Sequence, residues 1–407
     1  MQRYISADYI FPVSGPPLKE GLVVLDPDHQ ILDVFSAEEV RIKGIPGSET
    51  EKHKGIICPG FINAHGHLEL ACLKEAIPEK TGMAGFIKKI LSLRGKFSPE
   101  QVSVAIENAE KEMLAGGIVA AGDISNTSSS FAAKQKGHLL YHTFIEVLDL
   151  DPSKALAVFN EALRLSAGLS SFSSGVLSSS IVPHAPYSVS DPLFESIRNR
   201  SLTYKSPVCI HLQESQAETE LFVKRSGPIY DLFTSIGINL NYLPIAGQNS
   251  MKSTLNKLPK TNVMLVHNTY SEKEDIEWAM EQFNLPGPKA NLFFCFCPNA
   301  NLYIENKLPD FNLFAQAGAR CCVGTDSLAS NHRLSVLDEL KVISKAAPQI
   351  SFQTLLTWAS LNGAEFLGFE SKLGSIEKGK KPGLNLISDF DTGKLRLKPE
   401  SKLKKLC

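Results

Sequence analysis

Histidines and one aspartate stand directly after apolar runs of this chain, at positions where they could share a metal ion. The clearest case is the segment PGFINAHGH, which ends in His65 and His67. In an extended strand, residues two apart point to the same face, so both imidazoles can reach one cation. His211, His267 and Asp326 each follow a further apolar run. These residue types and positions indicate metal-assisted chemistry.

Each residue alone has a plainer explanation, because a lone histidine can be a hydrogen-bonded core residue and a lone aspartate can belong to a turn. Together they favour a site, since the carboxyl ends of barrel strands meet at one rim. Three imidazoles with one carboxylate suit zinc or another first-row divalent ion such as iron. A water at an open position would have a lowered pKa and provide hydroxide. Glu214, three residues after His211, could carry a proton between water and substrate. His267 and Asp326 could orient the hydroxide, and Asp326 could also take the proton of the water.

The elements that must position these residues alternate between apolar runs and segments of helical periodicity from residue 57 to about 330. This alternation predicts an α/β fold of the (β/α)8 TIM-barrel type. Strands are expected at Ile56–Ala64, Ile118–Ile124, Leu139–Leu148, Val176–Val182, Pro207–Leu212, Val263–Val266, Leu292–Phe296 and Ala319–Val323. Helices are expected at Ser98–Ala115, Lys154–Leu169, Asp191–Arg198, Glu218–Thr234 and Glu272–Phe283.

Both ends of the chain have the short apolar runs and turn residues that are typical of β-structure. The segment from Gly374 to about Leu397 could rejoin the N-terminal strands. The predicted domains are therefore a small β-sandwich from residues 1–57 and 373–407, and a barrel from residues 58–372.

Composition argues against several classes of protein. The chain has 407 residues, and its 42 Lys and Arg balance 43 Asp and Glu to a net charge of -1. This balance argues against a nucleic-acid or membrane partner, and the basic segment from Lys394 to Cys407 is interpreted as a solvated tail. No apolar stretch reaches the ~20 residues of a membrane span, and Met1 to Pro12 lacks the shape of a signal peptide. Eight cysteines without a CxxC pair suggest reduced thiols, so a cytoplasmic location is expected.

As an ordered set, these motifs resemble the amidohydrolase superfamily, and within it the cytosine deaminase and chlorohydrolase-like branch. The set comprises His65-Gly66-His67 after a PGFI strand, His211 with Glu214, His267, and Gly324-Thr325-Asp326-Ser327. The segments PHAPYS from residue 183, CPNAN from 297, SLASN from 327 and GSIEKGK from 374 support it. The resemblance runs from about residue 55 to 387.

The resemblance implies a barrel with a β-sandwich and one divalent metal ion, with zinc expected and iron as the alternative. The implied metal ligands are His65, His67, His211 and Asp326. His267 would contact the hydroxide or the substrate, and Glu214 would be the proton shuttle. Members of this branch commonly deaminate an adenine- or guanine-like ring: hydroxide adds to the amino-bearing carbon, the ring nitrogen is protonated and ammonia leaves. Relatives are often dimers, so a homodimer is a further expectation.

The expected substrate is a small molecule, an adenine-type nucleoside. Among deaminases of 6-aminodeoxyfutalosine, S-adenosylhomocysteine and guanine, the length, Glu69 and the SLASN segment favour the first. The alternative is hydrolysis of another ring C–N or C–Cl bond, in a triazine, guanine or a cyclic amide. A non-catalytic scaffold would be expected to have lost ligands, and none is lost here. Residues expected to line the pocket are Glu69, His184, Ser125 and Asn301; structural roles remain open for them, and Tyr187 fits packing equally well.

Overall fold

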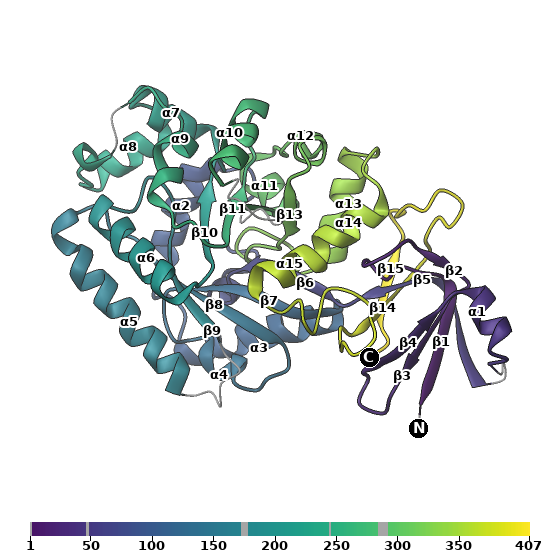
Figure 1. Cartoon of the computed structure of the whole chain (residues 1–407). Helices are drawn as coiled ribbons and strands as arrows, with labels where there is room; N and C mark the ends of the chain where they lie inside the picture. Colours follow the sequence, from purple (N-terminus) through teal and green to yellow (C-terminus); the bar gives the residue numbers. More distant parts are fainter. Residues whose placement is uncertain (1, 46–48, 172–177, 244–245, 284–291) are drawn as a thin grey trace.

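The computed structural model describes residues 2–45, 49–171, 178–243, 246–283 and 292–407. Strands from both ends of the chain gather at one side of the molecule, and parallel strands with their helices form the larger part (Figure 1). None of the helices in these ranges combines the length and apolar character that crossing a bilayer requires.

Two four-stranded parallel sheets carry the larger part of the fold. The first contains, in order, β6 (Phe61–Gly66), β7 (Ile118–Ser125), β8 (Leu140–Val147) and β9 (Ser178–Pro183). The second contains β10 (Val208–Leu212), β11 (Val263–His267), β12 (Leu292–Phe296) and β13 (Arg320–Val323). Every residue of β10, β11 and β12 is buried, which is typical of parallel strands covered on both faces.

Backbone contacts link the two parallel sheets at both of their edges. Between β6 and β13, Gly66 and Asp326 form a parallel bridge. There the N–H groups of Thr325 and Asp326 both donate to the His65 carbonyl oxygen, each over 3.1 Å. Between β9 and β10, the His211 N–H donates to the His184 carbonyl oxygen over 3.0 Å. Both links involve histidines that the sequence marks as candidate site residues.

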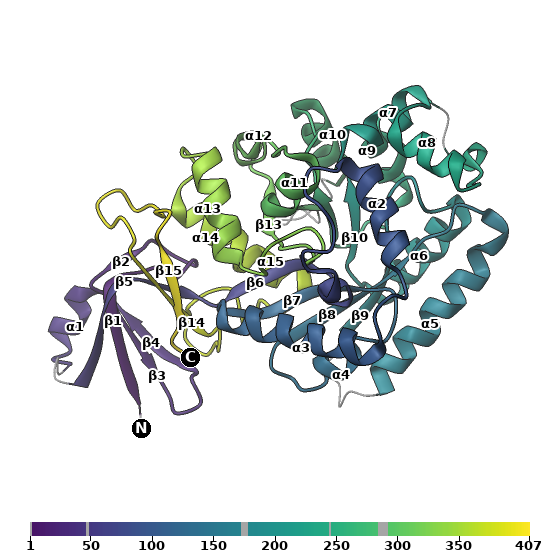
Figure 2. The ribbon, with the colours of Figure 1, turned by 180° about the vertical axis from the view of Figure 1, so that it is seen from behind.

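Helices connect the parallel strands and surround them (Figures 1 and 2). Their starts follow local sequence signals: α3, for example, begins after Ser98, whose hydroxyl caps the helix together with Gln101, and has Pro99 in its first turn. The α-helices are α2 (Gly82–Leu93), α3 (Pro99–Ala115), α4 (Phe131–Lys134), α5 (Ala155–Ser171), α6 (Asp191–Tyr204), α7 (Gln216–Lys224), α8 (Pro228–Ser235), α9 (Ser250–Thr254), α10 (Lys273–Phe283), α11 (Pro298–Glu305), α12 (Phe311–Gln316), α13 (Val336–Ala346), α14 (Phe352–Ala359) and α15 (Leu361–Leu367). Short 3-10 helices are η2 (Leu68–Leu73), η3 (Pro152–Lys154), η4 (Leu240–Tyr242) and η5 (Leu255–Lys257).

The two ends of the chain meet in one seven-stranded mixed sheet, the terminal sheet, with the order β15-β14-β5-β1-β3-β4 and β2 paired to β1. Only the β1–β5 pair in it is parallel. Ile5, Ile57 and Leu384 share its apolar core. Its elements are β1 (Arg3–Ile10), β2 (Leu18–Lys19), β3 (Leu22–Leu25), β4 (Ile31–Phe35), β5 (Thr50–Pro59), β14 (Leu384–Ser388) and β15 (Lys402–Lys405), with α1 (Ala37–Ile42) at its side.

The predicted α/β class with parallel strands is confirmed, and each expected strand has a counterpart. Expected strand Ile56–Ala64 is divided: residues up to Pro59 belong to β5, and β6 begins at Phe61. Gly60 separates them, since its N–H turns to the Pro382 and Gly383 carbonyls of the terminal region. Residues 176–177 of another expected strand lie outside the described residues.

The expected helix Glu218–Thr234 is two helices. Arg225 ends α7 with a left-handed backbone, φ 54°. Pro228 then starts α8, since proline is favoured at the first turn of a helix and excluded from its interior.

Gly324→Ala is expected to destabilise the junction between β13 and β6. A Cβ at this position would lie 2.7 Å from the His65 carbonyl oxygen and 2.8 Å from the His65 Cβ. Overpacking of this kind costs ~1–3 kcal/mol of unfolding free energy, measurable by urea denaturation. Gly168→Ala in α5 is the control, because apart from its chain neighbours and the backbone of its own helix no described atom lies within 4 Å of the added Cβ. Equal stability of the two variants would contradict tight packing at this junction.

Candidate metal centre and active site

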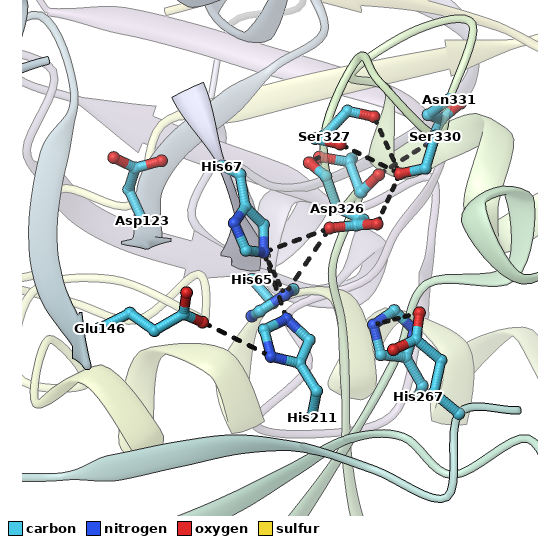
Figure 3. Close-up of polar contacts among 12 residues, drawn as sticks. His65, His67, Asp123, Glu146, His211, His267, Asp326, Ser327, Ser330 and Asn331 are labelled. Atoms are coloured by element: carbon cyan, nitrogen blue, oxygen red, sulfur yellow. Dashed lines mark hydrogen bonds and ion pairs between the residues drawn. The ribbon is translucent and has the colours of Figure 1, made fainter. Parts of the chain in front are cut away.

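Imidazoles and one carboxylate converge where β6, β10, β11 and β13 end (Figure 3). The Nε2 atom of His67 lies 3.1 Å from Nε2 of His65 and 3.3 Å from Nε2 of His211. The Oδ1 atom of Asp326 lies 3.3 Å from the same His67 nitrogen and 3.8 Å from His65 Nε2. Ligand atoms of His65, His267 and Asp326 also lie within 4.8 Å of one another.

The charge state of this cluster fits a bound cation. Burial lowers the pKa of His65 and His67 well below the ordinary value and that of His211 to about 4, with the neighbouring imidazoles adding to the effect for His65 and His67. The rings are therefore neutral at pH 7, and each can offer the lone pair of one ring nitrogen to a shared cation. Zinc–nitrogen bonds of ~2.0–2.1 Å at tetrahedral angles place ligand atoms ~3.3 Å apart, which matches this spacing.

Two residues of the cluster have strained backbone conformations. His267 has φ 76° and Asp326 has φ 55°, in the left-handed region that costs non-glycine residues ~1–3 kcal/mol. Backbone hydrogen bonds hold both: Asp326 donates to the His65 carbonyl, and Asn268 donates to the Leu212 carbonyl. The two strained residues are therefore ones whose side chains belong to the cluster.

The SLASN segment after β13 fixes the carboxylate of Asp326. The Ser330 hydroxyl donates to Oδ2 of Asp326 over 2.5 Å. The amide of Asn331 donates to the Thr325 carbonyl and to Glu339, over 2.9 and 2.8 Å. One carboxylate oxygen is thus held by the segment, while the other faces His65 and His67.

Glu214 and His267 form a second pair beside the cluster. Oε1 of Glu214 lies 3.3 Å from Nε2 of His267. Burial, with a contribution from the Asp326 carboxylate, raises the pKa of Glu214 well above its ordinary value. Nδ1 of His267 lies 2.9 Å from Oδ1 of Asn301, whose amide nitrogen donates to Thr269. The Nδ1–H therefore donates to Asn301, and the Nε2 lone pair of His267 faces a glutamic acid that can hold a proton.

A cavity of about 960 Å³ opens over these groups. Its lining includes His67, His211, Glu214, His267 and Asp326. Apolar side chains complete it: Met83, Phe86, Ile87 and Ile90 come from α2, and Phe233, Ile236, Ile238 and Tyr242 come from α8 and the segment after it. Since Ile236 and Tyr242 are 49% and 43% exposed and the site residues are largely buried, the apolar walls form the mouth.

Two of the four residues expected to face a substrate, Glu69 and His184, line this cavity. Tyr187, for which packing was equally expected, lines it too. The Glu69 carboxylate also accepts hydrogen bonds from the Asn126 N–H over 3.0 Å and from the Thr127 N–H and hydroxyl over 3.1 and 2.8 Å. It therefore joins the loop after β7 to the segment after His67. His184 lies 2.8 Å from the Ser188 hydroxyl through Nδ1.

Ser125 and Asn301 are not among the residues that line the cavity. Ser125 is fully buried, and its hydroxyl accepts a hydrogen bond from Lys134 over 3.0 Å. Asn301 holds the ring of His267, as described above. Both residues lie near a strand end, as expected, but their side chains bind other residues of the chain and do not face the cavity.

Sequence reasoning missed Glu146 and the pair Asp123–Lys134. Glu146 ends near the cluster: its Oε1 lies 3.6 Å from Nδ1 of His211, and its Oε2 accepts from the Asn126 amide over 3.1 Å. Its place near the end of an expected strand could have identified it. Lys134 lies in a four-residue helix without any such signal.

Neutral imidazoles and a carboxylate at the ends of parallel strands, beside a buried glutamate whose pKa is raised, define the class of metal-dependent hydrolases. The model of the Amidohydrolase family matches residues 56–405, and the chain belongs to this family.

Named relatives extend over most of the chain. An adenosine deaminase of Helicobacter pylori is 25% identical over 397 residues, 95% of this chain and 92% of that protein. An aminodeoxyfutalosine deaminase of Nitratiruptor is 25% identical over 362 residues, 88% of this chain and 85% of that protein.

Solved structures share the fold. Helicobacter pylori aminofutalosine deaminase with bound methylthio-coformycin has a TM-score of 0.81 and 23% identity, covering 96% of this chain and 93% of that chain. The zinc complex of atrazine chlorohydrolase from Arthrobacter aurescens has a TM-score of 0.72 and 19% identity, covering 94% and 86%.

His67→Ala is expected to lose most bound metal, because it removes the nitrogen that lies closest to both His65 and His211. The measurement is the metal-to-protein ratio by mass spectrometry after dialysis, with about one equivalent expected for the parent protein. His142→Gln is the matched control, since His142 is buried but bonds Ser178 and Ser180. Metal retention by His67→Ala at the parent level would show that the cluster is not the binding site.

Proposed function

We propose that this protein is a metal-dependent hydrolytic deaminase of adenine-type nucleosides that releases ammonia. The observation that carries the proposal is the buried Glu214–His267 pair, 3.3 Å apart, beside a cluster of neutral histidines at the base of one cavity. The names of the relatives support it, because they include adenosine and aminodeoxyfutalosine deaminases.

In this proposal His65, His67, His211 and Asp326 hold one divalent ion. The imidazole-rich donor set suits zinc or iron, and the zinc in the atrazine chlorohydrolase structure supports zinc. When bound, such an ion lowers the pKa of water toward neutrality and so supplies hydroxide for attack on the amino-bearing ring carbon.

The chain's own residues move the protons. Asp326 accepts the proton of the attacking water through the oxygen that faces the histidines. Glu214, whose raised pKa favours the protonated form, donates its proton to the ring nitrogen next to the carbon under attack. His267, held at Nδ1 by Asn301, presents Nε2 to Glu214 and orients the groups in the reaction. Asp326 then passes the water's proton to the departing amino group, which leaves as ammonia, while Glu214 takes back the proton of the added hydroxyl as the ring carbonyl forms.

Glu214→Gln is expected to reduce turnover ~10²–10⁴-fold, because it removes the proton donor. Metal content should stay at the parent level, since Glu214 is not one of the four proposed ligands. The assay follows ammonia release from adenosine, 5′-methylthioadenosine and 6-aminodeoxyfutalosine. Glu110→Gln is the control: this buried carboxylate accepts from Tyr141, and neither residue lines the cavity. Loss of metal from Glu214→Gln would overturn the assignment of roles.

The substrate favoured by the cavity is a nucleoside with a bulky 5′ substituent, such as 6-aminodeoxyfutalosine. The volume of about 960 Å³ is near the upper end of the ~300–1,000 Å³ usual for small-molecule sites. Glu69 and Glu146 supply acceptors for ribose hydroxyls near the metal ligands, while the apolar mouth between α2 and α8 would take the substituent. His184 lies between these regions and contacts the nucleoside.

Ile236→Asp is expected to raise the KM about tenfold for nucleosides with a large apolar 5′ group and to change that for adenosine less than ~2-fold, since one lost apolar contact is worth ~1.5 kcal/mol. The control is Leu156→Asp on α5, which is 70% exposed and outside the cavity lining. Steady-state kinetics on both substrates test this. An equal effect on the two substrates would place the 5′ group elsewhere.

The alternative function is hydrolysis of another ring C–N or C–Cl bond, as the similarity to atrazine chlorohydrolase allows. Release of chloride from a chlorotriazine, or opening of a cyclic amide, without release of ammonia from any adenine nucleoside would favour it.

The proposed architecture is a closed eight-stranded barrel over residues 58–372. The Gly66–Asp326 bridge and the His211–His184 backbone hydrogen bond at the two edges of the parallel sheets support closure. Residues 1–57 and 373–407 would form the small β-sandwich, supported by the apolar core that both ends share. The homodimer stays a prediction.

A further inference from the structure

A fully buried ion pair lies behind the histidine cluster, between Asp123 on β7 and Lys134 at the end of α4. Their charged atoms are 2.6 Å apart, and the side chains are 2% and 0% exposed. The Lys134 ammonium also donates to the hydroxyls of Ser125 and Thr143, over 3.0 and 3.1 Å. All three of its donors therefore have partners.

The carboxylate oxygen of Asp123 that does not face Lys134 binds the segment with the proposed ligands His65 and His67. Its Oδ1 accepts a hydrogen bond from the backbone N–H of Leu68 over 2.8 Å. Leu68 directly follows His67, and Asp123 is the strand partner of Gly66, which separates His65 from His67. Figure 3 shows Asp123 on the neighbouring strand beside His67.

A reciprocal contact reinforces this connection. Glu69, the next residue after Leu68, accepts from the backbone N–H groups of Asn126 and Thr127 at the end of β7. Each of the two segments thus supplies a carboxylate to the other's backbone. The register between β6 and β7 is irregular from Asn63 to Gly66, so these side-chain bonds replace regular strand pairing at the site.

We propose that Asp123 and Lys134 are positioning residues of the metal centre. The Lys134 ammonium orients the Asp123 carboxylate, and this carboxylate fixes the backbone after His67 so that His67 Nε2 faces His65 and His211. The inference rests on the metal site proposed above, and neither residue touches the substrate cavity. Positioning groups behind metal ligands typically change metal affinity ~10–100-fold when they are removed.

Two double variants separate this role from general stabilisation. Asp123→Leu/Lys134→Met and Asp123→Asn/Lys134→Met both remove the charge pair, which apolar residues of similar size often replace without loss of stability. They differ in one respect, because only asparagine retains an acceptor for the Leu68 N–H. The measurements are the zinc dissociation constant by chelator competition and the melting temperature of the metal-free protein.

The leucine-containing variant is expected to bind zinc ~10–100-fold more weakly than the parent, and the asparagine-containing variant within ~3-fold of it, at similar melting temperatures of the metal-free proteins. Glu110→Gln should lower stability without changing zinc affinity. Equal zinc affinity of the two double variants would overturn the inference. Failure of the parent protein to bind zinc would instead overturn the proposed metal site.

If the leucine-containing variant does not fold, the zinc affinity of the single variant Lys134→Met tests the inference instead. It leaves the Asp123 carboxylate buried and unpaired, so zinc affinity is expected to fall and then to recover when Asp123→Asn is added. Unchanged zinc affinity in Lys134→Met would also overturn the inference.

Discussion

The mutual approach of the His65, His67 and His211 nitrogens is the constraint on which the site depends. Burial favours the neutral form of these rings, and their Nε2 atoms lie only 3.1 and 3.3 Å apart. The fold must therefore enforce the geometry. It does so through the two sheet edges, where the His65 carbonyl accepts two backbone N–H groups and the His184 carbonyl accepts the His211 N–H.

Polar side chains around the cluster form hydrogen bonds that each fix the orientation of one functional side chain. Ser330 holds an oxygen of Asp326, Asn301 holds a nitrogen of His267, and Asn126 joins Glu69 to Glu146 through its backbone and its amide. Such contacts determine which atom of each functional group faces the cavity. They are short-range and directional, so a displacement of half an ångström in one strand would be transmitted to the cluster.

Much of the site could be predicted because residue type and strand position are both local properties. A histidine after an apolar run indicates the end of a strand, and the ends of parallel strands lie at one edge. Periodicity and motif alone therefore predicted that His65, His211 and Asp326 lie close together. Hydrogen-bond and ion-pair partners that are distant in the sequence cannot be recognised from such local patterns. Lys134 lies in a four-residue helix, and only the fold reveals that its ammonium lies against Asp123. Ser125 and Asn301 illustrate the same point, since their position was predicted but their hydrogen-bond partners were not. The apolar wall formed by α2 was not expected, because its role depends on packing against α8.

The single residue Gly60 separates the terminal sheet from the strand that carries His65 and His67. Its N–H is bound by carbonyls of Pro382 and Gly383, and β14 pairs with β5 immediately before it. The strand that begins the candidate metal site is therefore supported by residues that come much later in the sequence. During synthesis, the two histidines of β6 are made long before Pro382 and Gly383, so we expect metal to be captured only after this later segment has been made. A fusion partner that displaces β14 would act on the same strand from a distance.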